Sequence, residues 1–403
     1  MNVTITPRPL LGTIAAIPSK SQAHRLLICA ALAEEPTDLR CAALSRDILA
    51  TADCLRALGA RVDRTPEGFS VAPGPRPERA EADCGESGSP LRFLLPVAGA
   101  LGVDTTFFLH GRLPQRPLSP LWEEMERMGA RLSRPTGDTV RCQGALQPGA
   151  YTLAGDVSSQ FISGLLFALP GLPGDSEIQL TGSIQSKPYL DMTLAALRTF
   201  GIEILEEDRG YQIPGNQHFR SPGALAVEGD WSNGAFWLTA KALGSELRVT
   251  GLDSNSPQGD RAAEALLLQI LTQGGDIDVC QIPDLVPTLA VAAARGGGVT
   301  RFVGAGRLRI KESDRIASVS AMVRSLGGRT EEGPDSLTVY PTGLRGGTVS
   351  AENDHRIAMA AAVASTVCRE PVTILGAEAV EKSYPAFWQD FRSLGGKARE
   401  ETP

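Results

Sequence analysis

A short polar segment near the start of the chain carries the residue types of an anion-binding site. It runs Ser19-Lys20-Ser21, reaches Arg25 one turn later, and leads into an apolar stretch over residues 26–33. That stretch is typical of a buried helix, and Ser19 or Ser21 can cap its first turn. Free backbone N–H groups beside a lysine and an arginine favour an anion. For this segment alone, a capped helix with two solvated cations is an equally good interpretation.

Two carboxylates occur in otherwise cationic surroundings and are candidates for proton transfer. Asp284 precedes an apolar run, and Glu312 lies within the pentapeptide Lys311-Glu312-Ser313-Asp314-Arg315. Each also has a structural interpretation. Asp284 can simply cap the helix that follows, and the pentapeptide can be a solvated turn in which Ser313 or Asp314 caps the next helix.

Cations and hydroxyls recur before other apolar runs and enlarge the candidate site. Arginine offers planar two-point contacts to phosphate or carboxylate, whereas lysine offers a point charge and a proton. His355 can act as a base or order a turn, and Tyr189 can bind a ligand or plug a helix start. The cations are Lys20, Arg25, Arg92, Arg116, Lys187, Arg309, Lys311, Arg315, Arg356 and Lys382, and the neutral donors are Ser21, Ser158, Ser159, Gln160 and Ser186. Together they suit ligands with several phosphate or carboxylate groups.

The elements that must position these residues follow a repeat of two helix types. One type is an apolar helix with a polar head, and the heads are residues 19–21, 86–89, 158–160, 231–234, 283–284 and 353–356. The other is a charged amphipathic helix that ends in a glycine, at Gly59, Gly129, Gly201, Gly275, Gly327 and Gly395. Glycine is the expected helix stop there. Extended segments such as 61–63 with 69–71 and 202–204 with 211–213 predict hairpins after most stops.

These two signatures alternate and predict six α/β units, three in each half of the chain. The sixth unit has little chain after Gly395 for its last strands, so we expect Val3-Thr4-Ile5 to supply one. We therefore expect one domain from residues 1–16 with 229–403 and a second from residues 17–228. Two chain crossings between the domains suit a hinge, with the polar heads facing a cleft between them.

Composition excludes several classes of protein. The 403 residues carry 39 lysines and arginines against 46 aspartates and glutamates, a net charge of −7, so no basic surface indicates nucleic-acid binding. No window reaches the roughly 20 apolar residues of a membrane span. Seven cysteines without a CxxC pair and four histidines without ligand spacing favour a reduced, cytoplasmic protein with no metal site.

Nine motifs in chain order resemble those of the 5-enolpyruvylshikimate-3-phosphate synthase family. They are Ser19-Lys20-Ser21 with Arg25, Glu86-Ser87-Gly88-Ser89-Pro90-Leu91-Arg92, Leu113-Pro114-Gln115-Arg116-Pro117, Gly155-Asp156-Val157-Ser158-Ser159-Gln160-Phe161, Ser186-Lys187-Pro188-Tyr189, Pro283-Asp284, Arg309-Ile310-Lys311-Glu312-Ser313-Asp314-Arg315, Asn353-Asp354-His355-Arg356 and Glu381-Lys382-Ser383-Tyr384-Pro385. Each motif alone is weak, but together they span nearly the whole chain. The resemblance implies two similar domains, each of three βαβαββ units around buried parallel helices, an inside-out α/β barrel. It also implies a monomer that acts on small molecules without cofactor or metal.

The resemblance implies that the enolpyruvyl group of phosphoenolpyruvate passes to the 5-hydroxyl of shikimate 3-phosphate, with release of phosphate, on the way to chorismate and the aromatic amino acids. Asp284 is then the base for the 5-hydroxyl, Glu312 handles the methylene proton, and Lys20 with Lys382 assists the leaving phosphate. The residues implied for shikimate 3-phosphate are Lys20, Ser21, Arg25, Ser158, Ser159, Gln160, Ser186, Tyr189, Asp284, Arg307 and Lys311. Those implied for phosphoenolpyruvate are Lys20, Gly88, Arg116, Gln160, Arg315, Arg356 and Lys382.

Two residues depart from the family pattern. Glu86 stands where many relatives carry Asn and repels phosphoenolpyruvate unless it is paired, with Arg92 as a candidate partner. Arg307 stands where relatives often carry an Asn that holds the shikimate phosphate, so Arg307 either binds this phosphate more strongly or points away from it. Two alternatives remain open. One is the sister enolpyruvyl transferase acting on UDP-N-acetylglucosamine, whose usual Lys-Asn head is absent here because Ser21 follows Lys20. The other is a non-catalytic relative that binds polyanions.

Overall fold

The computed structural model describes residues 1–401, which fold as two compact units. The central unit contains Lys20–Val227, and the discontinuous unit contains Met1–Ser19 together with the chain from Glu228 onward. The first passage between them lies after Ser19 and not after residue 16, because a β-bridge from Pro18 to Gly229 keeps this stretch in the discontinuous unit. Each unit has its own apolar core.

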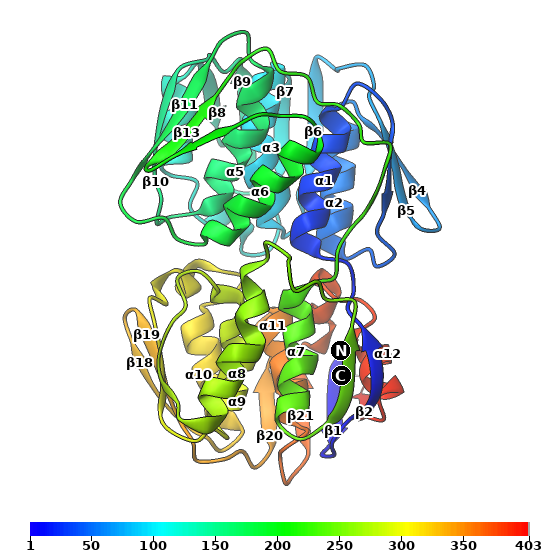
Figure 1. Ribbon diagram of the computed structural model, residues 1–403, viewed down its shortest axis with the longest axis vertical. Coiled ribbons are helices and arrows are strands. Elements are labelled where there is room, and N and C mark those ends of the chain that lie inside the picture. The colour runs from blue at the N-terminus through cyan, green and yellow to red at the C-terminus, as the bar shows by residue number, and fades with distance from the viewer. Residues whose placement is uncertain (402–403) are drawn as a thin grey trace. The chain divides into compact units, whose positions relative to one another are not determined.

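The central unit repeats one sheet topology three times (Figure 1). In each sheet the first two strands are parallel, and the third and fourth join antiparallel to what precedes them. The sheets, in order of pairing, are β6 (Arg79–Asp83), β7 (Asp104–Phe108), β9 (Thr139–Gly144) and β8 (Ala130–Ser133); β10 (Ala150–Ala154), β11 (Ser176–Thr181), β13 (Gly210–Ile213) and β12 (Leu205–Glu207); and β14 (Ala224–Ala226), β3 (Thr37–Arg40), β5 (Gly68–Ala72) and β4 (Arg61–Thr65).

The discontinuous unit has two such sheets and one shortened sheet. The complete sheets are β16 (Gly275–Asp278), β17 (Thr300–Val303), β19 (Ser336–Tyr340) and β18 (Arg329–Gly333); and β20 (Gly347–Ser350), β21 (Val372–Leu375), β1 (Asn2–Thr6) and β22 (Lys397–Glu401). As predicted, the N-terminal strand completes the last sheet, with Val3 opposite Ile374 and Glu400. The shortened sheet has only β2 (Leu11–Ala15) parallel to β15 (Glu246–Thr250). It lacks a hairpin because β16 of the next repeat begins directly at the glycine stop, Gly275.

Six buried helices alternate with six amphipathic helices, as the two sequence signatures predicted. The buried helices are α1 (Lys20–Leu32), α3 (Gly88–Leu101), α5 (Ser159–Ala168), α7 (Trp231–Ala242), α9 (Val286–Ala293) and α11 (His355–Ala364). The amphipathic helices are α2 (Arg46–Ala57), α4 (Leu121–Arg127), α6 (Lys187–Thr199), α8 (Ala263–Thr272), α10 (Arg315–Ser325) and α12 (Phe387–Ser393). All six predicted stop glycines have positive φ, from 76° to 105°, which glycine adopts without a Cβ penalty.

Short 3₁₀ turns precede or follow several of these helices. They are η1 (Leu113–Gln115), η2 (Leu169–Gly171), η3 (Gly259–Ala262), η4 (Pro283–Leu285), η5 (Gly306–Ile310) and η6 (Ala377–Lys382). Four of them, η1 and η4 to η6, carry or adjoin residues predicted for the site.

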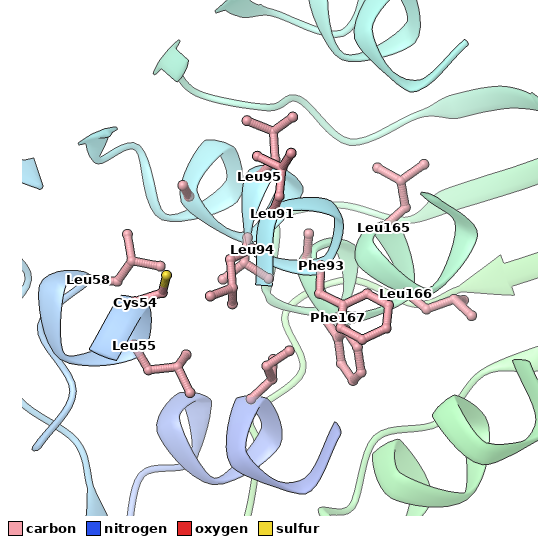
Figure 2. Packing of buried hydrophobic residues seen from close by; sticks show 14 of the residues in the cluster. Cys54, Leu55, Leu58, Leu91, Phe93, Leu94, Leu95, Leu165, Leu166 and Phe167 are labelled. Carbon is pink, nitrogen blue, oxygen red and sulfur yellow. The ribbon is translucent and has the colours of Figure 1, made fainter. Parts of the chain in front are cut away.

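Close packing between buried helices fixes the polar heads at their starts. Figure 2 shows α3 packed against α2 and α5 in the central unit. Phe93 of α3 and Phe167 of α5 meet edge to face with ring centroids 5.6 Å apart. Leu55 of α2 and Leu94 of α3 are buried in the same cluster. Because such interiors are packed as densely as organic crystals, a head cannot shift without moving its neighbours.

One predicted hairpin begins later than expected. The backbone N–H of Ile202 donates to the carbonyl of Leu197, and its side chain is buried in the core. Residues 202–204 are therefore part of the connection after α6, and β12 begins only at Leu205. It pairs Glu206 with Tyr211.

Candidate active site

The first head of the central unit lies at the start of α1. The helix begins at Lys20, so Ser21 lies inside the first turn and is not its cap, while Oγ of Ser19 lies 3.3 Å from Oε1 of Gln258. Nζ of Lys20 lies 2.8 Å from Oδ2 of Asp47 in α2, and both side chains are 15% exposed. A carboxylate that no sequence motif singled out thus holds the predicted catalytic lysine.

Arg25 lies further along α1 and is almost fully buried. Its Nε donates to Oγ1 of Thr193 at 2.9 Å, Nη1 to the carbonyl of Ser21 at 2.6 Å, and Nη2 to the carbonyl of Tyr189 at 2.8 Å. Its guanidinium carbon lies 5.2 Å from the ring centroid of Phe93 and 5.9 Å from that of Tyr189. Burial lowers the pKa of Arg25 to about 10. None of these hydrogen-bond acceptors is an acid, so an anionic ligand is the favourable complement to this buried cation.

Gly88 opens α3, and Arg116 directly follows η1. A Cβ added to Gly88 would lie 2.9 Å from Nη1 of Arg116, so the guanidinium lies directly over this glycine. The carboxyl of Glu86 lies against Gly111, where an added Cβ would be 2.8 Å from its Oε2. The structure therefore brings together two residues that were predicted to bind phosphoenolpyruvate.

Gln160 lies in the first turn of α5, and both ends of its side-chain amide are bound. Oε1 accepts from Nη1 of the buried Arg92 at 2.8 Å, and Nε2 donates to Oγ of Ser89 at 3.0 Å. Oγ of Ser158 caps the helix by accepting from the backbone N–H of Gln160 at 3.3 Å, and Ser159 is the first residue of α5. The two serines and the amide predicted to contact the substrates therefore have fixed positions in one helix start.

The segment before α6 is strained at Ser186. Its φ is 57°, a left-handed conformation that costs a non-glycine residue about 1–2 kcal/mol. Lys187 pairs with Asp191 at 2.6 Å and with Glu206 at 3.0 Å. Although burial acts in the opposite direction, these two acids raise the pKa of Lys187. Ser186 stays a candidate for substrate binding, whereas Lys187 belongs to an ion pair along α6.

Arg315 is the centre of the site in the discontinuous unit. It is 1% exposed, and its Nη1, Nη2 and Nε donate to Asp284, Glu312 and Asp354, each at 2.7 Å. Although burial alone lowers it, these carboxylates hold the pKa of Arg315 well above its usual value. The two residues predicted to transfer protons therefore share one guanidinium.

Asp284 does not cap the helix that follows it. It lies within η4, the N-cap of α9 is Leu285, and no side chain bonds the N–H groups at that helix start. Instead its Oδ2 accepts from Nη2 of Arg356 at 3.0 Å, and its Oδ1 lies 3.9 Å from Nζ of Lys311. The capping interpretation of Asp284 is wrong because its carboxylate is turned towards three cations.

The pentapeptide 311–315 is not a solvated turn either. Asp314 caps α10, while Oγ of Ser313 donates to Oδ2 of Asp354 at 3.1 Å. Asp354 is fully buried and caps α11 by accepting from the backbone N–H of Arg356 at 3.0 Å. His355 is buried beside it, with Nδ1 3.9 Å from Oδ1 of Asp354. Asp354 thus joins the starts of α10 and α11.

The remaining cations of the discontinuous unit have different environments. Nζ of Lys382, the last residue of η6, donates to the carbonyl of Asn353 at 2.7 Å. Burial, with a further contribution from Arg307 in η5, lowers the pKa of Lys311 to about 8. Arg309 donates to two carbonyls of the β18–β19 turn and braces that hairpin.

Sequence reasoning assigned no role to three acids near the predicted residues. Asp354 lies in the head at 353–356, where it could have been predicted as a helix cap. Asp260 in η3 accepts from the hydroxyl of Ser232, and burial together with nearby Asp284 raises its pKa to about 7. Asp47 lies 27 residues from Lys20, and no local pattern indicates that contact.

Helices long and apolar enough to cross a membrane do not occur within residues 1–401.

The family model described as EPSP synthase (3-phosphoshikimate 1-carboxyvinyltransferase) matches residues 5–391. The 3-phosphoshikimate 1-carboxyvinyltransferase of Clostridium kluyveri is 40% identical, covering 99% of this chain and 98% of the relative. That of Clostridium acetobutylicum is also 40% identical, over the same shares of both chains.

Solved structures share the fold at lower identity. The EPSP synthase of Acinetobacter baumannii has a TM-score of 0.81 at 22% identity, covering 99% of this chain and 100% of that one. The enolpyruvyl transferase NikO of Streptomyces tendae has a TM-score of 0.78 at 19% identity, covering 100% and 99%. At these identities the likeness shows the fold, two units of βαβαββ repeats around buried helices. With the family match and the 40% identity along the whole length, the chain belongs to the EPSP synthase family.

Proposed function

We propose that the protein transfers the enolpyruvyl group of phosphoenolpyruvate to the 5-hydroxyl of shikimate 3-phosphate and releases phosphate. Family membership along the whole chain supports the reaction. The structural observation that carries the proposal is the sharing of Arg315 by Asp284 and Glu312. The reaction needs two proton transfers, and this guanidinium holds two carboxylates next to each other.

In the addition step, the 5-hydroxyl oxygen bonds to C2 of phosphoenolpyruvate. Asp284 accepts the hydroxyl proton, and Glu312 delivers a proton to the methylene carbon, which becomes a methyl group in the tetrahedral intermediate. Each such transfer contributes about 10²–10⁴-fold to the rate. Arg356, which donates to Asp284 at 3.0 Å, keeps that carboxylate oriented.

In the elimination step, the bond from C2 to the phosphate oxygen breaks and a proton leaves the methyl group. Glu312 takes this proton back, and the double bond of the enolpyruvyl ether forms. Lys20 and Lys382 stabilise the negative charge on the departing phosphate. No redox change occurs in either step, and the family pattern implies that the reaction uses no cofactor.

The proposed ligand sets are those implied by the family pattern. Shikimate 3-phosphate is bound by Lys20, Ser21, Arg25, Ser158, Ser159, Gln160, Ser186, Tyr189, Asp284, Arg307 and Lys311. Phosphoenolpyruvate is bound by Lys20, Gly88, Arg116, Gln160, Arg315, Arg356 and Lys382. The buried guanidinium of Arg25, with neutral acceptors only, supports its assignment to a phosphate. The two sets contain residues of both units.

We also propose that the protein works as a cytoplasmic monomer. Seven free cysteines, six of them buried, suit a reducing compartment. Sedimentation equilibrium tests the monomer, and a mass of twice 42.6 kDa would contradict it.

The decisive test is phosphate release from phosphoenolpyruvate with either shikimate 3-phosphate or UDP-N-acetylglucosamine as acceptor. We expect release with shikimate 3-phosphate alone. Release with UDP-N-acetylglucosamine alone would identify the sister activity, and no release with either acceptor would leave a polyanion-binding protein.

Substitution of the two carboxylates tests their roles. Asp284→Asn and Glu312→Gln should each lower turnover by about 10²–10⁴-fold while shikimate 3-phosphate still binds. Near-normal turnover in either variant removes that residue from its assigned role. Lys20→Met should weaken both binding and turnover, because its charge serves both.

A further inference from the structure

Two parallel contacts join α1 to α2 in the central unit. Nζ of Lys20 lies 2.8 Å from Oδ2 of Asp47, and Nδ1 of His24 lies 2.7 Å from Oγ1 of Thr51. Within each helix the two residues are four apart, so they lie on one face, one turn after the other. The two helices are therefore locked in register at the start of α1, where Lys20 is the first helical residue.

The second contact is buried and uncharged. His24 and Thr51 are almost fully enclosed, and burial together with the neighbouring Lys20 and Arg25 lowers the pKa of His24 well below its usual value. The imidazole is therefore neutral at physiological pH. Because this imidazole is buried and uncharged, it does not leave Thr51 to bind an anion from solution. The contact between His24 and Thr51 therefore fixes the register of the two helices.

The first contact differs because it is partly open and charged. Asp47 is not the cap of α2, since Oγ of Ser45 accepts from the backbone N–H of Ile48. Its carboxylate instead bonds the lysine at 2.8 Å, with both side chains 15% exposed. Below this point α2 is held in the core by Cys54 and Leu55. The carboxylate of Asp47, which lies on a helix packed in the core, thus contacts the side chain of Lys20, which has four rotatable bonds.

We propose that Asp47 is a positioning residue for Lys20. By holding the ammonium group in one place before the substrates bind, it removes the need to order a flexible side chain during the reaction. Ordering one such side chain costs about 0.5–1.5 kcal/mol. The inference rests on the proposed function only in that Lys20 acts on the leaving phosphate.

A purely structural role for Asp47 makes a different prediction. An acid in the first turn of a helix stabilises it by about 0.3–1 kcal/mol through the helix dipole. Loss of that stability would act in the same way whether or not Lys20 is present. A positioning role acts only through Lys20.

A double-mutant cycle separates the two roles. The variants are Asp47→Asn, Lys20→Met and the two combined, and kcat is measured for phosphate release. We expect Asp47→Asn to lower kcat about fivefold to tenfold in the wild-type background and less than about twofold in the Lys20→Met background. Equal factors in both backgrounds, or no effect in the wild-type background, would overturn the proposal.

The matched control is Asp53→Asn on the same helix. Asp53 pairs with Arg56 and is 61% exposed, so this variant should leave kcat unchanged. Thermal unfolding of every variant identifies any loss of folded protein.

A second readout does not depend on turnover. In ¹⁵N-lysine NMR of the ligand-free protein, the ammonium signal that disappears in Lys20→Met should be sharp in the wild type and broadened in Asp47→Asn. An unchanged signal in Asp47→Asn would overturn the positioning role even if the enzyme is active. If the wild type shows no turnover with shikimate 3-phosphate, the proposed function fails while the NMR comparison still decides the role of Asp47.

Discussion

Arg25 of the central unit and Arg315 of the discontinuous unit are both almost fully buried, yet they have opposite kinds of partner. Arg25 donates to one hydroxyl and two carbonyls. Arg315 donates to three carboxylates. The pKa values of the two guanidinium groups shift in opposite directions for this reason, down for Arg25 and up for Arg315.

The difference in partners indicates that the surroundings of Arg25 and those of Arg315 suit different tasks. Around Arg25 the positive charge is not neutralised by its hydrogen-bond partners, so the central unit is prepared for an anion. Around Arg315 the carboxylates balance the cations, so an incoming anion has to compete with Asp284, Glu312 or Asp354. The surroundings of Arg25 are suited to binding an anion, and those of Arg315 to chemistry in which carboxylates exchange protons.

The largest expected effect concerns stability. Arg315→Leu leaves the fully buried Asp354 and the partly exposed Asp284 and Glu312 without this cation, and it should destabilise the protein by about 3–5 kcal/mol. Arg25→Leu leaves only neutral acceptors and should cost about 1–2 kcal/mol. Urea denaturation, followed by circular dichroism, measures the free energy of unfolding of both variants. Equal decreases in the two variants would contradict the comparison.

The next effect concerns ligand affinity. Arg25→Gln should weaken shikimate 3-phosphate binding about 10–100-fold, because a charge-assisted hydrogen bond to phosphate contributes about 1.5–3 kcal/mol. Isothermal titration calorimetry measures the affinity of each variant for shikimate 3-phosphate. Thr193→Val is the control, since it removes one neutral partner of Arg25 and keeps the cation. An affinity in Arg25→Gln close to the wild-type value would show that this cation faces no ligand.

The third effect concerns the pH dependence of shikimate 3-phosphate binding. It tests Lys311, a cation of the discontinuous unit that is proposed to bind this ligand. The pKa of Lys311 is lowered to about 8, so its ammonium is present below that pH and lost above it. The affinity for shikimate 3-phosphate should therefore fall by up to about tenfold per pH unit above 8. The ligand phosphate is already doubly ionised there, since its second pKa is about 6.

Lys311→Arg provides the control for this pH profile. Arginine stays protonated throughout the range, so the decline above pH 8 should disappear. A decline of the same size in both proteins would assign it to a group other than Lys311.

The smallest expected effect concerns Gly88→Ala. The added Cβ would lie 2.9 Å from Nη1 of Arg116 and push the guanidinium away. Because a flexible side chain can yield, we expect the KM for phosphoenolpyruvate to rise only about fivefold, with little change in the KM for shikimate 3-phosphate. Gly137→Ala is the control, since no atom lies within 4 Å of its added Cβ. Equal changes in both KM values would indicate a general distortion of α3.

Local patterns were enough to predict most of the fold. Each buried helix has its polar head and each amphipathic helix its glycine stop within a few residues, so both signatures can be read without tertiary contacts. The missing hairpin after Gly275 could not be predicted, because β16 uses that position as the first strand of the next repeat. The left-handed conformation of Ser186 was equally hidden, since nothing local favours it in a non-glycine residue.

The site was predicted as a set of residues but not as a network. Arg315 was assigned to phosphoenolpyruvate, whereas its partners Asp284 and Asp354 lie 31 and 39 residues away in the chain. The sequence allows Asp284 to be either a helix cap or a proton-transfer residue, and only the hydrogen bonds from Arg315 of α10 and Arg356 of α11 show that its carboxylate is turned to these cations. Contacts of this kind depend on how helices pack, which sequence spacing alone does not determine.

The pairing of β1 with β21 and β22 also has a consequence for the order of folding during synthesis. Thr4 bonds Thr373 across 369 residues, so β1 emerges from the ribosome long before either of its neighbours exists. At roughly 5–20 residues per second this delay is roughly 20–70 s. The central unit, complete at Val227, can fold in that interval. Until β21 and β22 are made, β1 remains a nascent strand without its sheet, and the discontinuous unit closes last.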